Sequence, residues 1–310
     1  MERSGISELY LIMGGPQGAG LETSMAVIAY ALARLGYGVI ADREYFSNIK
    51  GRHSYIHMGI SSRRIPRSLD YPVKILAAMD AETVFTHYTD LDIDGVLVYD
   101  QAVEDKTFDQ FPSMENELRE RLSIEVREMG IDGSIKSLVK KLSENKNITP
   151  ISFKYIDILN EVSKKHHIPS QQVSRYLSSI IIGSISGLLN IDIDLIKEAF
   201  TRRFKAREEL IEANIAIVMK VVEKIRDFSK KIKLEKPSIG IKEYVLATGN
   251  DLIAMGKTVG GLGYQAYYPI TPAADESLFL EKYESLEIDG EPIGSLIVMQ
   301  TEDEISAINS

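Results

Sequence analysis

A glycine-rich segment stands between an apolar run and an amphipathic one, and its residue types suit anion binding. It reads Gly14-Gly-Pro-Gln-Gly-Ala-Gly20. A glycine loop that opens a helix can present backbone N–H groups to a phosphate. No Gly-Lys-Ser/Thr follows, so this is not a P-loop, and the dinucleotide fingerprint is only approximated. Asp42 lies 22 residues after Gly20, about where a ribose-binding acid would stand. The segment either binds a nucleotide or CoA phosphate, or is a tight turn in which glycine permits close packing.

A second candidate is the rigid segment Tyr268-Pro-Ile-Thr-Pro272, which ends a strand-like run. A proline on each side of Ile270 and Thr271 fixes the backbone, so the Thr271 hydroxyl can be held in one direction. Such preorganisation suits a binding site. The residues alone favour a simpler role, with Thr271 as N-cap and Pro272 as first residue of a helix through Leu278 and Leu280.

A third candidate is the acidic segment Thr301-Glu-Asp-Glu304, which follows a predicted strand. Thr301 and Glu304 have the spacing of a capping box, and Asp303 suits the positive end of the helix dipole. We expect Glu302, at the first helical position, to point past the helix from the carboxyl edge of the strand. Glu302 is therefore either a functional carboxylate or an acid that the helix dipole favours.

The surrounding pattern predicts an α/β fold built from short apolar strands and amphipathic helices. In the N-terminal half, we predict a strand–glycine loop–helix–strand unit and then further strands, at 9–13, 22–35 (helix), 39–42, 53–60, 84–86 and 95–100. The middle is predicted to be helical, over 113–127, 134–144, 169–189, 193–204 and 207–232. The last part predicts a second α/β unit, with strands at 244–247, 264–268 and 295–300 and a helix at 251–259.

These elements predict two domains joined by a charged linker with proline and glycine. The boundaries are 1–233 for the first α/β domain, 234–241 for the linker and 242–310 for the second domain. Within the first domain, about 105–170 is predicted to be a helical insertion. Because the helix after Thr301 reaches Ser310 after barely two turns without a stop signal, we expect the second domain to be incomplete.

Composition narrows the class of protein. Lys and Arg total 36 and Asp and Glu total 45, a net charge of −9, which argues against a nucleic-acid partner. No apolar run has the length of a membrane span, and no export signal is present, so we expect a cytoplasmic protein, and the Ile, Lys and Glu content is typical of a thermophile. The chain has no cysteine, so it holds no thiolate nucleophile or ordinary iron–sulfur cluster of its own. His166 and His167 would point about 100° apart on a helix, so no metal site is predicted.

The segments around the second and third candidates resemble the α subunit of 2-oxoacid:ferredoxin oxidoreductases. The specific features are Tyr268-Pro-Ile-Thr-Pro272 and, 31 residues beyond its threonine, Gln300-Thr-Glu302. The N-terminal region resembles the γ domain of the same family, through Gly14–Gly20, Lys50-Gly-Arg52, Ile182–Leu189 and Asn214. The order, with γ ahead of α, is similar to the fused large subunit of archaeal two-subunit enzymes. The resemblance therefore implies a γ-type domain, a linker and the start of a pyrimidine-binding domain for thiamine diphosphate.

The resemblance also implies a chemistry: CoA-dependent oxidative decarboxylation of a 2-oxoacid, such as pyruvate or 2-oxoglutarate, to an acyl-CoA, with electrons passed to ferredoxin. Glu302 would hydrogen-bond the aminopyrimidine ring nitrogen of thiamine diphosphate, and Thr271 would donate to the substrate. Tyr268, Pro269 and Ile270 would shape the wall beside the cofactor. Lys50, Gly51 and Arg52 would line the CoA side.

The family places magnesium, the diphosphate site and a [4Fe-4S] cluster on a β subunit, so the resemblance implies a hetero-oligomer that is active only with that subunit. Two other functions remain open from the residues. One is an NAD- or FAD-dependent oxidoreductase that uses Gly14–Gly20 and Asp42. The other is a non-catalytic assembly subunit, which the apolar stripe of the 207–232 helix would serve.

Overall fold

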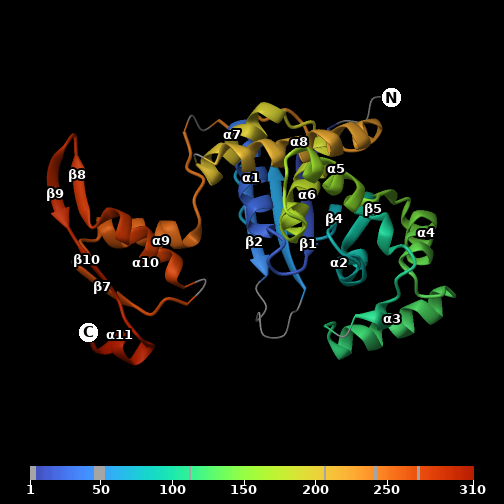
Figure 1. The fold of residues 1–310 in the computed structure, drawn as a ribbon, viewed down its shortest axis with the longest axis horizontal. Coiled ribbons are helices and arrows are strands. Elements are labelled where there is room, and N and C mark those ends of the chain that lie inside the picture. Colours follow the sequence, from blue (N-terminus) through green and yellow to red (C-terminus); the bar gives the residue numbers. More distant parts are fainter. Residues whose placement is uncertain (1–4, 45–52, 112, 206, 241–242, 271–272) are drawn as a thin grey trace. The chain divides into compact units, whose positions relative to one another are not determined.

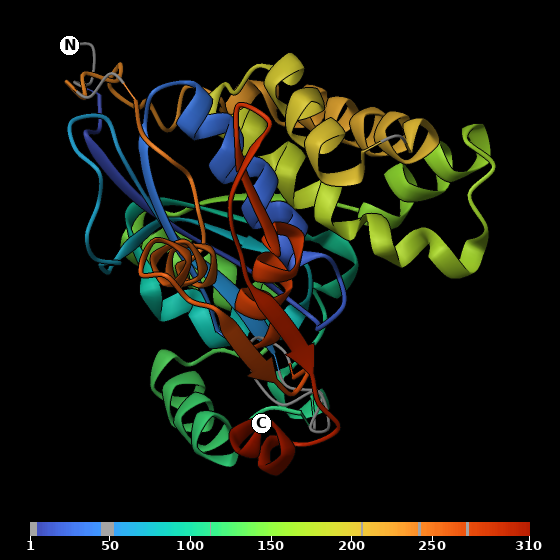
Figure 2. The ribbon, with the colours of Figure 1, turned by 90° about the vertical axis from the view of Figure 1, so that its left-hand side faces the viewer.

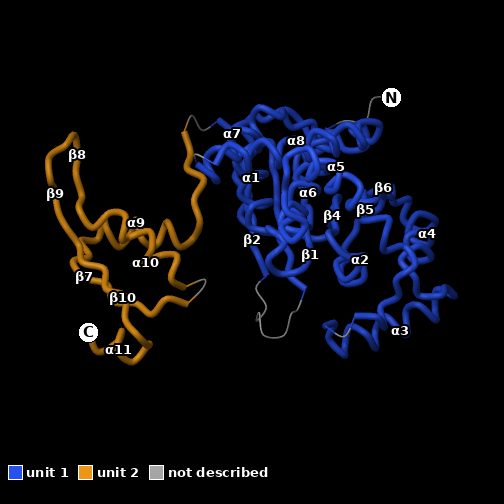
Figure 3. The backbone as a smooth tube through the Cα atoms, viewed as in Figure 1, with its two compact units in different colours: residues 1–240 blue, residues 241–310 orange. Residues whose placement is uncertain are grey.

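A computed structural model describes residues 5–44, 53–111, 113–205, 207–240, 243–270 and 273–310. The chain divides into two compact units, residues 1–240 and 241–310, which are coloured separately in Figure 3. Across the described ranges, none of the helices combines the length and the apolar character that crossing a membrane requires.

The first unit is built on a six-stranded sheet whose order is β2-β3-β1-β4-β5-β6 (Figure 1). The neighbours β1, β4, β5 and β6 run parallel, while β3 is antiparallel to both β1 and β2. The strands are β1 (Glu8–Gly15), β2 (Gly38–Glu44), β3 (Ser54–Ser61), β4 (Val73–Ala78), β5 (Leu91–Asp100) and β6 (Thr149–Phe153).

Helices cover both faces of this sheet, and the alternation along β1 shows how. Leu9, Leu11 and Met13 enter one buried cluster, whereas Ile12 enters another on the opposite face. The first cluster packs against α1 (Leu21–Arg34), α5 (Tyr155–Lys165), α6 (Leu177–Leu189), α7 (Ile193–Phe204) and α8 (Glu208–Ile225). The second packs against α2 (Ala81–His87), α3 (Asn116–Met129) and α4 (Ile135–Lys146). Figure 2 shows α5 to α8 together on one side and α3 on the other. Burial on both faces explains why the consecutive residues Leu11, Ile12 and Met13 of β1 are all apolar.

Two glycines let α6 and α8 approach closely. A Cβ added at Gly183 would lie 2.7 Å from Val221 Cβ, and one at Gly187 would lie 2.7 Å from Ile225 Cδ1. Next to this contact, Ser179 donates a buried hydrogen bond of 2.5 Å to Asn214 Oδ1. The segment Ile182–Leu189 and Asn214 therefore serve helix packing.

Several predicted elements of the first unit are confirmed and others are wrong. The strand–loop–helix–strand unit at the N-terminus is confirmed as β1, α1 and β2. The predicted strand at 84–86 is wrong: it lies in α2, which begins because the Asp80 side chain caps it by accepting from the Thr83 N–H at 2.9 Å. A short apolar run in the sequence does not distinguish a strand from a buried helix. The Asp80 cap favours the helix here.

The segment 105–170, which we predicted to be a helical insertion, also extends the sheet. Its strand β6 pairs in parallel with β5, with Val98 opposite Ile151. The helix predicted over 207–232 is shorter in the structure. It is α8, which ends at Ile225 and is followed by a 3₁₀ turn over Arg226–Phe228.

The second unit contains a parallel pair of strands, β7 (Tyr264–Tyr267) and β10 (Ile297–Gln300). Its remaining elements are α9 (Gly249–Val259), α10 (Ala274–Leu280), the hairpin of β8 (Ser285–Ile288) with β9 (Glu291–Ser295), and α11 (Glu304–Asn309). The predicted strand at 244–247 is wrong: the segment is irregular, because within the described residues it has no strand to pair with, and Val245 is exposed. The hairpin β8–β9 was not predicted.

Candidate functional site

The carboxyl ends of β7 and β10 lie side by side in the second unit. Gln300, the last residue of β10, is in register with Tyr267, the last residue of β7. Tyr268 therefore leaves one strand where Thr301 leaves the other. Side chains just beyond the carboxyl ends of parallel strands are where α/β sheets present groups to ligands. The structure thus places Tyr268, Pro269 and Ile270 along the chain that leaves β7, and Glu302 on the chain that leaves β10.

Thr301 ties these two strand ends together. Its N–H donates to the Tyr267 carbonyl at 2.8 Å, and its hydroxyl lies 3.1 Å from the same oxygen and 3.0 Å from the Asp303 carbonyl. The predicted capping box of Thr301 and Glu304 is therefore wrong. Asp303 is the N-cap of α11, because its carboxylate accepts the Ser306 N–H at 2.6 Å. The hydrogen bonds from Ser306 also hold the pKa of Asp303 below its usual value.

Glu302 lies one residue before that cap, so it is not the first helical residue as predicted. It sits on the short connection between β10 and α11 and is exposed. Within the described residues its carboxylate has no hydrogen bond or ion pair. Because helix capping uses Asp303 and the strand contact uses Thr301, the Glu302 carboxylate is free to meet a ligand.

The connection after β7 is stiffened by its own backbone. The Ile270 N–H donates to the Tyr268 carbonyl at 2.9 Å, and the Ile270 carbonyl accepts the Ala274 N–H at 2.8 Å. Ile270 is 52% exposed, so an apolar side chain stands open beside the strand ends. The helix α10 begins at Ala274 with Ala273 as N-cap, two residues later than the predicted cap. Thr271 and Pro272 lie outside the described residues.

Side chains of β7 make polar contacts with Glu281, which follows α10, and with Lys257 of α9. Sequence reasoning missed these contacts. The Tyr267 hydroxyl donates to Glu281 Oε1 at 2.6 Å, and this hydrogen bond raises the pKa of Tyr267 to about 12. Lys257 of α9 donates to Gln265 Oε1 at 3.0 Å and pairs with Glu276 of α10. The paired residues belong to different elements and are 8 to 19 positions apart, so no helix or strand period points to them.

The glycine loop of the first unit joins β1 to α1 as predicted. Gly18 and Gly20 have φ values of +82° and +84°, which L-residues with side chains rarely adopt, and Gly20 is the N-cap of α1. Gly14 is tightly packed, since an added Cβ would lie 2.5 Å from Thr83 Cγ2. Close packing thus explains Gly14, and ligand binding by the rest of the loop stays a prediction.

The remaining sequence candidates are placed as follows. Asp42 lies on β2, and its carboxylate accepts the Arg43 N–H at 2.8 Å. Lys50, Gly51 and Arg52 lie outside the described residues. Among those that are described, no group of three or more His, Asp or Glu side chains could hold a metal ion.

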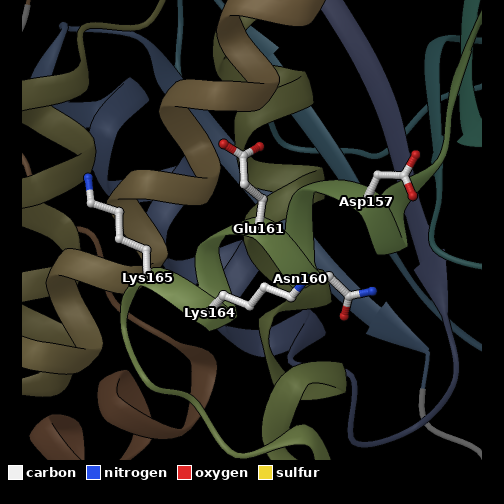
Figure 4. Close-up of a pocket in the computed structure, with 5 residues that line it drawn as sticks. All are labelled: Asp157, Asn160, Glu161, Lys164 and Lys165. Atoms are coloured by element: carbon white, nitrogen blue, oxygen red, sulfur yellow. The ribbon is translucent and has the colours of Figure 1, made fainter.

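A hollow on the exposed face of α5 is not a candidate site. Asp157, Asn160, Glu161, Lys164 and Lys165 line it, and Figure 4 shows their side chains projecting in different directions from one helix. Glu161 is paired with Lys220 of α8 at 2.6 Å. Because the groups do not converge and Glu161 is already paired with a residue outside the hollow, they form a solvated helix face.

Comparison with known proteins identifies the class. Residues 10–224 match the family model described as pyruvate ferredoxin/flavodoxin oxidoreductase, which is well over half of the chain. The chain belongs to this oxidoreductase family.

Individual relatives point to one subunit. The α subunit of 2-oxoacid:ferredoxin oxidoreductase 1 from Aeropyrum pernix is 46% identical over 305 residues, covering 98% of this chain and 48% of the relative. The corresponding subunit from Sulfurisphaera tokodaii is 35% identical over 304 residues, covering 96% of this chain and 47% of the relative. The chain therefore spans about half the length of these curated relatives.

A solved structure shares the fold. The 2-oxoglutarate:ferredoxin oxidoreductase from Magnetococcus marinus, with 2-oxoglutarate, coenzyme A and succinyl-CoA bound, matches with a TM-score of 0.65. The match covers 98% of this chain and 45% of that chain at 21% identity. The likeness shows a common α/β architecture.

Proposed function

We propose that this chain is the γ-like domain and the first part of the α domain of a thiamine-diphosphate-dependent 2-oxoacid:ferredoxin oxidoreductase. The observation that carries the proposal is the position of Glu302, an exposed carboxylate without a partner among the described residues. It lies beside the Tyr268–Ile270 segment at the joined ends of β7 and β10. The family membership and the relatives' names support this reading over an NAD- or FAD-dependent enzyme or a non-catalytic assembly subunit.

The residues beyond these strand ends fit the aminopyrimidine half of the cofactor. A pyrimidine ring needs an apolar wall and an acceptor or donor at one ring nitrogen, and Ile270 with Glu302 offers both. When bound, thiamine diphosphate supplies the carbanion chemistry of decarboxylation. Glu302 would hydrogen-bond the ring nitrogen, and in a site closed to water its carboxylate would stabilise the proton held there.

The other residues would position the substrates. Thr271 would donate its hydroxyl to the carboxylate of the 2-oxoacid, while Tyr268, Pro269 and Ile270 would set the distance between that carboxylate and the cofactor wall. Lys50 and Arg52, with Gly51 between them, would take the phosphates of CoA on the first unit. No cysteine is present, so a β subunit would supply the thiolates of a [4Fe-4S] cluster, along with the Mg²⁺ and diphosphate site. We place this hetero-oligomer in the cytoplasm, with ferredoxin as electron acceptor.

The test is Glu302→Gln in the complex of the full α subunit with its β subunit. Glutamine keeps the shape and loses the charge, and we expect 2-oxoacid-dependent ferredoxin reduction to fall by about 10²–10⁴-fold, the range for loss of a group that acts on a proton. Glu304→Gln, two residues away, is the matched control and should keep its activity. Full activity in Glu302→Gln would refute the catalytic assignment.

A further inference from the structure

One ammonium group in the second unit contacts the elements on both sides of the Tyr268–Ile270 segment. Lys257 Nζ, from the last turn of α9, donates to Gln265 Oε1 of β7 at 3.0 Å. The same ammonium pairs with the carboxylate of Glu276, the third residue of α10. Because β7 leads into the segment and α10 follows it, Lys257 connects the strand before the segment to the helix after it.

The alternation of side chains along β7 explains why Gln265 reaches these helices. Gln265 and Tyr267 are two positions apart on the strand, so their side chains share one face of the sheet. Gln265 Nε2 donates to Ser277 Oγ of α10 at 3.0 Å. The Tyr267 hydroxyl donates to Glu281, just beyond the end of α10. This face of β7 is therefore the one that α10 packs on, with α9 beside α10 (Figure 1).

Within the described residues, the start of α10 has no side-chain cap. Its N-cap is Ala273, which has no polar side chain to accept an N–H from the first turn. The Ala274 N–H donates to the Ile270 carbonyl at 2.8 Å, so Ile270 is tied to the first turn of α10. Glu276 belongs to the same turn. A shift of Glu276 would therefore shift the exposed apolar side chain of Ile270 as well.

The apolar core of the second unit is small, which gives these polar contacts more weight. Among the described residues, its buried cluster consists of Ala254 on α9, Leu280 on α10 and Leu296 before β10. Apolar burial has no preferred direction, whereas a hydrogen bond constrains both distance and angle. The Glu276 side chain is 16% exposed and the Lys257 side chain 37%, so water screens their attraction only in part. Polar contacts therefore decide much of how α10 is oriented on β7.

We propose that Lys257 is a positioning residue for the apolar wall of the cofactor site, a role that rests on the function proposed above. Its ammonium fixes Glu276 relative to Gln265. The first turn of α10 then holds Ile270 at a set distance from Glu302, on the chain that leaves β10. A displacement of about 1 Å within a site can cost about 10²-fold in rate, even when the displaced group does no chemistry.

The test is calorimetric titration of thiamine diphosphate, with Mg²⁺ present, into the cofactor-free complex of the full α subunit with its β subunit. Lys257→Met keeps the length of the side chain and removes its charge. We expect this change to weaken thiamine diphosphate binding by about tenfold, the size of one lost charge-assisted contact. Lys282→Met, at an exposed lysine of the same unit, is the matched control and should leave the affinity unchanged.

Further variants separate positioning from folding. Lys257→Arg keeps the positive charge and should restore most of the affinity for thiamine diphosphate. Glu276→Gln keeps the side-chain shape and should weaken binding in the same direction. The combination of Lys257→Met with Glu276→Gln should bind no more weakly than Lys257→Met alone, because the two residues act as a pair. An ion pair that only stabilised the fold would change the Tm and the yield of complex, and leave the affinity of the assembled complex unchanged.

Failure of the positioning role and failure of the proposed function give different results. If the unmodified complex shows no saturable binding of thiamine diphosphate, the proposed function is refuted and the role of Lys257 with it. If the unmodified complex and Lys257→Met bind the cofactor equally well, the positioning role alone is overturned. Additive losses in the double variant would also overturn it, because independent effects would show that Lys257 does not act through Glu276.

Discussion

The Thr301 N–H and hydroxyl both lie within hydrogen-bond distance of the Tyr267 carbonyl, at 2.8 and 3.1 Å. This contact extends the β7–β10 ladder by one step beyond the last strand pair, Gln300 and Tyr267. It fixes the point at which the two chains separate, and therefore the distance between Glu302 and the segment that begins at Tyr268. Thr301, which the sequence pattern predicts to be a helix cap, thus instead joins the ends of β7 and β10 at the candidate site.

Replacing Thr301 by valine should weaken the contact with the Tyr267 carbonyl while keeping the side-chain shape. The backbone bond remains and the hydroxyl bond is lost, which costs about 1 kcal/mol. If the lost hydrogen bond raises the activation free energy by this amount, turnover of the 2-oxoacid by the complex should fall about five- to tenfold. Thr301→Ser keeps the hydroxyl and should retain turnover. Equal activities of both variants and the unmodified enzyme would show that the backbone bond suffices.

Thr271→Ala should separate substrate binding from helix capping. We expect a larger loss in 2-oxoacid turnover than in thiamine diphosphate affinity, because the proposed partner of the hydroxyl is the substrate. Steady-state kinetics with a cofactor titration on the same complex measures both quantities. Thr271→Ser is the control that should restore turnover. A parallel loss of turnover and cofactor affinity would argue for a capping role alone.

Gly183→Ala should destabilise the first unit through the contact between α6 and α8. The added Cβ would lie 2.7 Å from Val221 Cβ and 3.0 Å from the Val218 carbonyl oxygen, so the helices must move apart. Overpacking of this kind costs about 1–3 kcal/mol, and thermal unfolding should show a lower Tm. Gly256→Ala, in α9, is the matched control: no atom lies within 4 Å of its Cβ position, and the change should be neutral or stabilising by about 0.5–1 kcal/mol. An unchanged Tm for Gly183→Ala would show that α6 and α8 can move apart to accept the methyl group without loss of stability.

Local signals predicted those parts of the fold that local interactions decide. The glycines at 14–20 and the amphipathic helix after them fixed β1, α1 and β2, because turn chemistry and helix period act over a few residues. The resemblance at Tyr268-Pro-Ile-Thr-Pro272 and at Gln300-Thr-Glu302 located the two loops of the candidate site, and the strand register then placed them together.

The errors arose where a distant partner decides between two equal local patterns. Thr301 and Asp303 can each cap a helix together with the residue three positions further on. The Tyr267 carbonyl decides between them, because it accepts the Thr301 N–H. The segment 244–247 has strand composition, but a strand also needs a neighbour. The hairpin β8–β9 did carry a signal, since Asp289 and Gly290 both have positive φ, as in a two-residue hairpin turn.

A buried chain of polar groups links β3 to α2 and makes the first unit sensitive to acid. His53 Nε2 lies 3.1 Å from His87 Nε2, and His87 Nδ1 lies 2.8 Å from Asp90 Oδ2. The Tyr55 ring stacks on the His53 ring. Burial first, and then the nearby His87, lower the pKa of His53 to about 3 from an ordinary value of 6.5. The folded chain therefore keeps this imidazole neutral where the unfolded chain would protonate it.

The linkage gives a signed prediction for stability. Between pH 6.5 and about 3 the unfolded state binds a proton at residue 53 that the folded state does not, so the free energy of unfolding falls as the pH falls. The slope from this one group approaches about 1.4 kcal/mol per pH unit. Urea unfolding of His53→Gln at a series of pH values should show a slope smaller by about one proton. His167→Asn, at an exposed position with a φ of +53° that asparagine tolerates, is the control that should keep the original slope. Identical slopes for His53→Gln and the unmodified chain would mean that His53 is protonated in the folded state as readily as in the unfolded one.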